Sequence, residues 1–184
     1  GQVLVKSGIA CAGGHAFKLT LTGIGTHAIS PQDGSDVIST AMQIIDSWQS
    51  MLSRQIDPQQ PVVLSVCSIH AGEMGATNVL PSTAVFSGTI RTFNDPLRES
   101  ILKKMRQRAE SISKFNGCTC MMEEEYQFPV LVNHDAVTQI VKQAAVEVVG
   151  PNAVFTVPEP SIGSEDFAQY AQKIPASYFM FGVR

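Results

Sequence analysis

The chain has 184 residues, of which 44% are hydrophobic and 16% are charged, and its net charge is −3. This length fits one domain, or one domain and part of a second, with enough apolar material for a buried core. The 13 Lys and Arg are spread along the sequence, which argues against nucleic acid or an anionic membrane as a partner, because such binding needs a concentrated basic patch. No apolar run approaches the ~20 residues of a membrane span. Four cysteines without a CxxC pair are typical of reduced thiols in a cytoplasmic protein.

The first two thirds of the chain predict strands and helices in the order βαββαβ. Alternating polar and apolar residues predict strands over residues 15–22, 61–69, 84–93 and 118–127. Apolar residues at helical spacing predict helices over 36–54 and 95–115, with Phe115 on the buried face of the second. Packing both helices on one face of a four-stranded antiparallel sheet gives an α+β, ferredoxin-like module over residues 14–127.

The remaining residues have a different pattern. Helices over 133–149 and 164–173 alternate with short strands over 154–157 and 177–182, which is typical of an α/β layer. Fewer than ~60 residues cannot cover both faces of such a sheet. Residues 128–184 are therefore interpreted as part of an α/β domain that exposes apolar surface.

Three polar residues lie at predicted loops or strand ends: His27, Asn78 and Arg91. His27 follows two glycines and could be presented to a ligand, or it could be a surface histidine. Asn78 could bind a ligand or cap a turn. Arg91 could hold a carboxylate through two hydrogen bonds or pair with a neighbouring acid.

The segment Gly163-Ser164-Glu165-Asp166 also has two interpretations. Ser164 could cap a helix whose first turn carries the two acids, or the acids could face a cleft at a strand-to-helix junction. His70 and His134 have no ligand-type neighbour at useful spacing and are interpreted as ordinary histidines. We predict that this chain supplies no metal site, because its sequence holds no complete set of metal ligands.

Four motifs, in register across nearly the whole chain, resemble those of the metal-dependent amidohydrolase and exopeptidase family that includes aminoacylases, hippurate hydrolases and auxin-conjugate hydrolases. These are Gly25-Thr-His27-Ala-Ile-Ser-Pro31, Ile69-His70-Ala-Gly72 with Asn78-Val-Leu-Pro81, Gly88-Thr-Ile-Arg91-Thr-Phe93, and Gly163-Ser-Glu-Asp-Phe167.

The resemblance implies a catalytic domain, with two zinc (or manganese) ions, that is interrupted by a dimerising lid. Residues 14–127 would be the lid of a homodimer, and residues 1–13 and 128–184 part of the catalytic domain. His27 would stabilise the oxyanion in the partner's active site, Asn78 would bind substrate and Arg91 its carboxylate, and Gly163, Ser164 and Glu165 would line the cleft. The expected metal ligands and general base lie outside the chain, so we expect no hydrolysis by these residues alone.

Two functions are compatible with these observations. One is a fragment of an amidohydrolase that cleaves N-acyl amino acids, in which His27, Asn78 and Arg91 converge on a shared pocket. The alternative is a stand-alone ferredoxin-like module for dimerisation or small-molecule binding, without catalysis.

Overall fold

A computed structural model describes residues 1–183, which divide into two compact units. Unit 1 contains residues 1–14, 91–95 and 127–183, and unit 2 contains residues 15–90 and 96–126. Each unit is described separately below.

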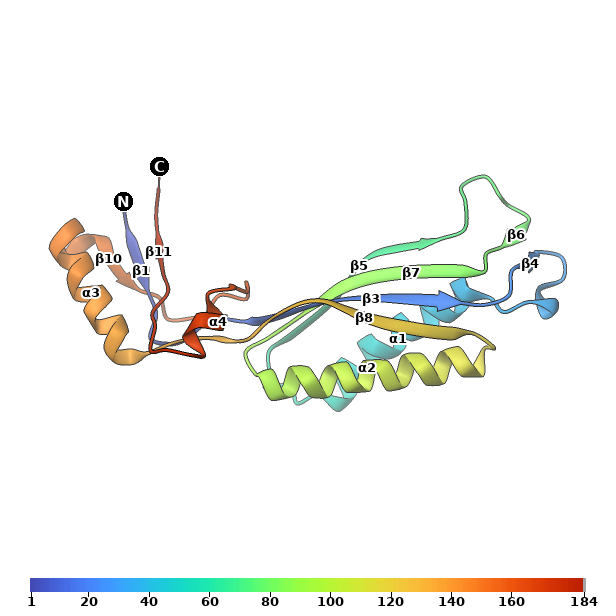
Figure 1. Cartoon of the computed structure of the whole chain (residues 1–184), viewed down its shortest axis with the longest axis horizontal. Coiled ribbons are helices and arrows are strands. Elements are labelled where there is room, and N and C mark those ends of the chain that lie inside the picture. The colour runs from blue at the N-terminus through green and yellow to red at the C-terminus, as the bar shows by residue number, and fades with distance from the viewer. Residues whose placement is uncertain (184) are drawn as a thin grey trace. The chain divides into compact units, whose positions relative to one another are not determined.

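Unit 2 is built on a four-stranded sheet with two helices on one face (Figure 1). The strand order is β5-β7-β3-β8, so the first and third strands in sequence occupy the centre. This arrangement confirms the predicted α+β, ferredoxin-like fold. The elements are β3 (Gly13–Thr22), α1 (Val37–Gln55), β5 (Val62–Ala71), β7 (Thr83–Thr92), α2 (Asp95–Phe115) and β8 (Thr119–Phe128).

The core of unit 2 lies between the sheet and the helices. Trp48 on α1 is completely buried, and its ring contacts Phe17 of β3 and Phe86 of β7 at centroid distances of 5.4 and 5.5 Å. Its indole N–H donates to the carbonyl oxygen of Met105 on α2 at 3.0 Å. One side chain therefore ties the sheet to both helices. Close packing extends to the backbone, because a Cβ at Gly88 would lie 2.0 Å from the Ser65 carbonyl oxygen.

The two long helices begin and end near the predicted residues. The Asp36 carboxylate caps α1 by accepting hydrogen bonds from the backbone N–H groups of Ile38 and Ser39. The prediction that Phe115 is buried was wrong, because its side chain is 89% exposed. The buried stripe of α2 continues through Ala109 to Ser113, and a residue two positions beyond Ser113 points to the opposite side of the helix.

A small two-stranded sheet at one end of unit 2 was not predicted. It pairs β4 (Thr26–His27) antiparallel with β6 (Val79–Leu80), and the short helix η1 (Pro31–Asp33) follows β4. Strands of two residues leave no periodic pattern in the sequence, so they could not be recognised there.

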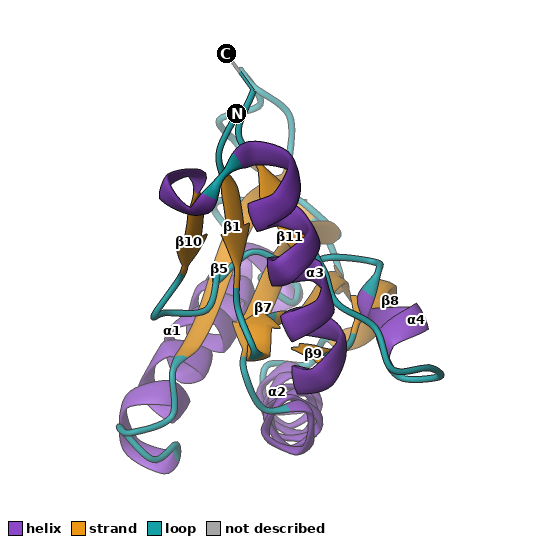
Figure 2. Ribbon diagram, turned by 90° about the vertical axis from the view of Figure 1, so that its left-hand side faces the viewer, coloured by secondary structure: helices purple, strands orange, loops and turns teal. Residues whose placement is uncertain are grey.

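Unit 1 contains two small sheets. β1 (Val3–Val5) pairs parallel with β10 (Val154–Thr156) and antiparallel with β11 (Phe179–Phe181), and β2 (Gly8–Cys11) pairs with β9 (Leu131–Asn133). Helix α3 (Asp135–Val149) lies beside the three-stranded sheet (Figure 2), and η2 (Pro151–Ala153) follows it.

The second helix predicted in this unit is shorter than expected. α4 spans only Ala168–Ala171, so Ser164 does not cap a helix and the two acids do not occupy a first helical turn. The segment before α4 forms turns, and the Ser164 hydroxyl instead accepts a hydrogen bond from Arg91. The structural interpretation of the Gly163–Asp166 motif was therefore wrong.

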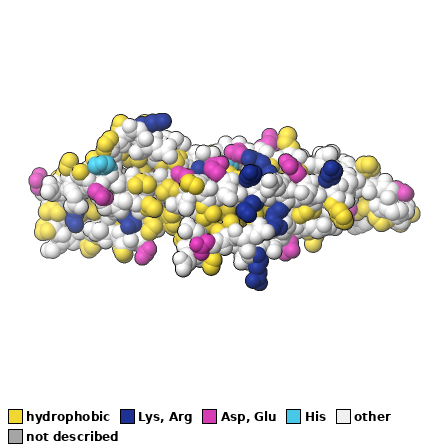
Figure 3. Space-filling view, turned by 90° about the horizontal axis from the view of Figure 1, so that it is seen from below, with side chains coloured by type: hydrophobic (Ala, Val, Ile, Leu, Met, Phe, Trp, Pro, Cys, Tyr) yellow, Lys and Arg dark blue, Asp and Glu magenta, His cyan; other side chains and the backbone are white. Residues whose placement is uncertain are grey.

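Basic residues are less evenly distributed than the sequence suggested. Six of the 13 lie on α2, and Figure 3 shows basic side chains gathered on the helix-covered face. Acidic groups accompany them: Glu99 and Glu110 lie on the same helix, and Arg106 pairs with Glu124 of β8. Among residues 1–183, no helix has the length and apolar character needed to cross a bilayer.

Candidate functional site

The β4–β6 pair brings two of the predicted site residues together. His27 is paired with Val79, and the backbone N–H of Ala28 donates to the carbonyl oxygen of Asn78 at 3.0 Å. The His27 Nδ1 accepts a hydrogen bond from the backbone N–H of Ile29 at 3.3 Å. Both His27 and Asn78 are exposed, so each can reach a group outside its own chain.

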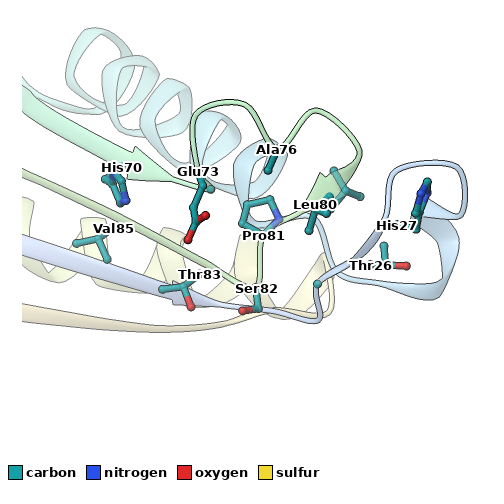
Figure 4. A pocket seen from close by; sticks show the side chains of 13 residues that line it. Thr26, His27, His70, Glu73, Ala76, Leu80, Pro81, Ser82, Thr83 and Val85 are labelled. Carbon is teal, nitrogen blue, oxygen red and sulfur yellow. The ribbon is translucent and has the colours of Figure 1, made fainter.

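A hollow of about 710 Å³ adjoins this pair and is lined by residues of unit 2. Its walls include apolar groups such as Leu80, Pro81 and Val85. Figure 4 shows His70 and Glu73 pointing into the space above β7, with His27 at the outer end. His70 therefore lines this hollow, although the sequence analysis interpreted it as an ordinary histidine.

Arg91 is in unit 1, where it contacts the other predicted motif. Its Nη1 donates a hydrogen bond to the Ser164 hydroxyl, which joins residues 73 positions apart in the sequence. Gly14 permits this contact, because a Cβ at that position would lie 2.6 Å from Ser164 Oγ and 2.9 Å from Arg91 Nη1. Any larger residue at position 14 would displace one of the two side chains.

The turn that carries Ser164 is held at its start, where the backbone N–H of Gly163 donates to the Ser161 hydroxyl at 3.1 Å. At its other end, the ring of Phe167 packs against that of Tyr178 at a centroid distance of 5.9 Å. Burial and then the negative charge of Glu165 raise the pKa of Tyr178. Burial and the same carboxylate raise the pKa of the Cys11 thiol. The charge of Glu165 therefore disfavours ionisation of both Tyr178 and Cys11.

The structure thus forms two clusters from the predicted residues. His27 and Asn78 meet in unit 2, while Arg91, Gly163, Ser164 and Glu165 meet in unit 1. The hollow beside His27 is lined by neither Asn78 nor Arg91, so it is not the shared pocket predicted for the three polar groups.

Several residues of these clusters were missed at the level of sequence. Gly14 lies beside Arg91 and Ser164, and Tyr178 is hydrogen-bonded to Asn133, so both depend on residues far along the chain, and neither belongs to a local motif. The adjacent glycines 13 and 14 at the start of a strand were the one signal available, since glycine inside a strand often marks a close approach.

The described residues do not fit a resident metal. No three His, Cys, Asp or Glu side chains within residues 1–183 are placed to hold an ion. No metal ligand is therefore assigned among the described residues.

Comparison with known proteins identifies the family. The model of the peptidase dimerisation domain of the M20 family matches residues 9–116. Similar proteins include thermostable carboxypeptidase 2 of Saccharolobus solfataricus and N-acetyl-L-cysteine deacetylase of Bacillus subtilis, both 34% identical over the whole chain. IAA-amino acid hydrolase ILR1-like 4 of Arabidopsis thaliana is also 34% identical over the whole chain. The chain spans 46%, 43% and 42% of the length of these three relatives.

Solved structures show the same relationship. A putative aminohydrolase from methicillin-resistant Staphylococcus aureus superimposes with a TM-score of 0.80 at 27% identity, over 97% of this chain and 45% of that one. The Bacillus subtilis YXEP protein, described as a dinuclear metal-binding peptidase, gives a TM-score of 0.69 at 27% identity over 96% of this chain and 42% of that one. The chain therefore belongs to the M20 family of peptidases and related hydrolases, and it contains the dimerisation domain of that family.

Proposed function

We propose that this chain is the dimerisation lid and part of the catalytic domain of a metal-dependent amidohydrolase that cleaves N-acyl amino acids. Unit 2 corresponds to the lid expected over residues 14–127, and unit 1 to the catalytic portion expected over residues 1–13 and 128–184. The observation that carries the proposal is the contact between Arg91 and Ser164. This contact joins two of the motifs that resemble the amidohydrolase family, and it places the Arg91 guanidinium beside the turn that carries Ser164.

Arg91 is suited to hold the free carboxylate of the substrate. A guanidinium binds a carboxylate through two parallel hydrogen bonds, and the neutral Ser164 hydroxyl orients it without neutralising its charge. Among the relatives, one is named a deacetylase of N-acetyl-L-cysteine and another a hydrolase of an amino-acid conjugate. Both names describe substrates with an acylated amino acid.

His27 and Asn78 act on the active site of a second copy in this proposal. Both are exposed at the end of unit 2, where they can reach a group on another chain. His27 would donate a hydrogen bond to the oxyanion of the tetrahedral intermediate, and Asn78 would bind the substrate. A homodimer of cytoplasmic chains satisfies this requirement, and the match to a dimerisation domain supports it.

The parent enzyme would bind two zinc or manganese ions, which would activate water for attack on the amide carbon. The relative described as dinuclear supports two metals in the parent. The alternative of a stand-alone binding module is not better supported, because matches with hydrolases extend over the whole chain and not over the lid alone.

The proposal can be tested with the full-length protein that contains this chain, by measuring its hydrolysis of a panel of N-acyl amino acids. Arg91→Ala should raise KM about 10- to 100-fold for acids, since a hydrogen bond to a charged group contributes ~1.5–3 kcal/mol. The corresponding methyl esters should be affected little. Arg108→Ala is a matched control, because Arg108 also donates to a serine, Ser47, but lies on α2. Equal losses on acids and esters would contradict the role of Arg91.

Mixed dimers test whether His27 acts across the dimer. At substrate concentrations well below KM, the His27→Ala and Arg91→Ala homodimers should each retain little of the wild-type activity. In the mixed dimer, one active site receives an intact Arg91 from its own chain and an intact His27 from the other. Mixing should therefore restore about half of the wild-type activity per dimer if the two residues act in trans. No recovery in a verified mixed dimer would show that they act within one chain.

A further inference from the structure

The hollow beside His27 has walls that are fixed within unit 2. β4 and β6, which line it, are paired, and the backbone N–H of Gly23 donates to the carbonyl oxygen of Ser82 at 2.8 Å. Gly25 lets the two segments approach closely, because a Cβ at that position would lie 2.9 Å from the Leu80 carbonyl oxygen. The hollow is therefore formed by the single chain and does not need a ligand to shape it.

The hollow is chemically suited to an uncharged apolar group. Val85 lies on the face of β7 opposite the buried core residues, and Leu80 and Pro81 add apolar surface. Figure 4 shows His70 and Glu73 pointing into the same space. Among the described residues, no Lys or Arg lines the hollow, so the Glu73 carboxylate would repel an anionic group there. The carboxylate end of an N-acyl amino acid is thus disfavoured in this hollow, and the apolar end is favoured.

His27 connects this hollow to the reacting atoms in the proposed function. It lines the hollow, and it would donate a hydrogen bond to the oxyanion, which forms from the carbonyl oxygen of the acyl group. The acyl chain is attached to the same carbon as that oxygen. Arg91, the group proposed to hold the substrate carboxylate, does not line the hollow. The acyl chain is therefore the part of the substrate that can extend from His27 into it.

We propose that this hollow binds the acyl chain of a substrate held in the active site of a second copy, and that Val85 helps to determine which acyl chains are accepted. The inference rests on the proposed function, because it uses His27 as the donor to the oxyanion. The volume of about 710 Å³ is within the ~300–1,000 Å³ typical of small-molecule sites, which is far more than an acetyl group needs. The preferred substrates are therefore N-acyl amino acids with acyl chains longer than acetyl.

The length of the acyl chain gives the first test. With the full-length protein and a single amino acid, kcat/KM should rise at least about tenfold from the N-acetyl to the N-hexanoyl substrate, because each added methylene removes apolar area from water. No dependence on the acyl chain, or a dependence only on the amino-acid side chain, would overturn the inference.

Substitutions of Val85 test the hollow directly. Val85→Trp fills part of it and should lower the ratio of kcat/KM for hexanoyl to that for acetyl at least about fivefold, whereas Val85→Ala should move the preference toward longer chains. Misfolding cannot produce these opposite shifts. Val63→Trp is the matched control, because Val63 lies on β5 of the same sheet, is 39% exposed and does not line the hollow. Equal changes in Val85→Trp and Val63→Trp would contradict the role of Val85.

Mixed dimers test whether the hollow serves the same active site as His27. In a dimer of one His27→Ala chain and one Arg91→Ala chain, the intact active site receives His27, and therefore the hollow, from the Arg91→Ala chain. Val85→Trp should lower the hexanoyl preference when it is on that chain and have little effect when it is on the His27→Ala chain. The reverse pattern, or the same effect from both chains, would show that the hollow does not act together with His27.

Failure of the proposed function would look different. A full-length protein that hydrolyses no N-acyl amino acid would refute the proposed function and the inference with it. A protein that hydrolyses these substrates, depends on Arg91 for acids and shows no preference among acyl chains would refute only the inference about the hollow.

Discussion

Units 1 and 2 are stabilised in different ways. The core of unit 2 is one cluster of 17 buried apolar residues between sheet and helices. The corresponding cluster in unit 1 has three, Cys11, Leu131 and Ala168. Large apolar side chains of unit 1 remain exposed, including Ile140 at 64%, Val148 at 82% and Phe181 at 54%. Unit 2 therefore has one continuous core, whereas the other apolar residues buried in unit 1, such as Val3, Val5 and Ala12, lie outside its small cluster.

Directional polar bonds hold the elements of unit 1 together instead. Asn133 connects the segment after β1 to the segment before β11, and Asp95 accepts a hydrogen bond from the backbone N–H of Val130. Polar bonds of this kind contribute only ~1 kcal/mol each, but they fix geometry more narrowly than apolar contact does. Apolar packing therefore stabilises unit 2, while hydrogen bonds fix the positions of the elements of unit 1, the unit that contains Arg91.

Trp48→Ala should give the largest loss of stability. It removes a completely buried ring and leaves the Met105 carbonyl without its donor, so we expect the free energy of unfolding to fall by ~3–5 kcal/mol. Urea denaturation with hydrogen exchange should locate the loss in unit 2. Phe115→Ala, at a position 89% exposed, is the control and should cost less than ~0.5 kcal/mol. A loss confined to unit 1 amides would contradict the comparison.

His15 should give unit 2 a pH-dependent stability. It is completely buried on β3, and neither ring nitrogen has a hydrogen-bond partner within residues 1–183, although Nε2 lies 3.4 Å from Glu124 Oε2. Burial and then the positive charge of Arg98 lower the pKa of His15, an effect that Arg106 reinforces and Glu99 opposes. The unfolded chain therefore binds more protons below the normal histidine pKa, so stability is full above that pKa and falls as the pH drops toward the lowered one.

Urea denaturation between about pH 5 and 8 would measure this dependence. His15→Leu should flatten the part of the curve that lies below the normal histidine pKa. An unchanged slope in the variant would assign the pH dependence to other groups.

Polar substitutions on the exposed face of α3 should have the smallest effect on folding. Ile140→Glu together with Val148→Lys should change the free energy of unfolding by less than ~0.5 kcal/mol, because neither side chain is buried. The same change should reduce self-association of this chain, as measured by light scattering, since it interrupts exposed apolar surface. Met42→Lys is a control on unit 2 with the same 64% exposure as Ile140. If it reduced association equally, the apolar surface of unit 1 would not be the cause.

The sequence predicted what regular periodicity encodes. The stripe Val37, Ala41, Ile44 and Trp48 is buried as expected, and the alternation along β7 correctly separated Phe86 and Ile90 from Arg91. These features depend on residues close together in the sequence, and burial of one face produces them directly.

The contacts of the site could not be predicted in the same way. Ser164 is a residue type that often caps helices, but its hydroxyl instead accepts a hydrogen bond from the guanidinium of Arg91, 73 positions away in the sequence. Tyr178 and Asn133 have no motif that marks them, because their roles come from neighbours supplied by other strands. At Ser164, the local preference for capping a helix was therefore outweighed by a hydrogen bond to a residue distant in the sequence.

The strand order of unit 2 has a consequence for exchanging parts between related enzymes. β3 and β8, where the chain enters and leaves this unit, are neighbours in the sheet, and insertions with adjacent ends are readily transplanted. A graft of residues 15–126 would include residues 91–95 of unit 1, so it would move His27, Asn78 and Arg91 together but would leave Ser164 behind. The chimera would then combine Arg91 of the donor with the turn of the recipient enzyme. Its activity would depend on whether that turn carries a hydroxyl in position to accept a hydrogen bond from the guanidinium.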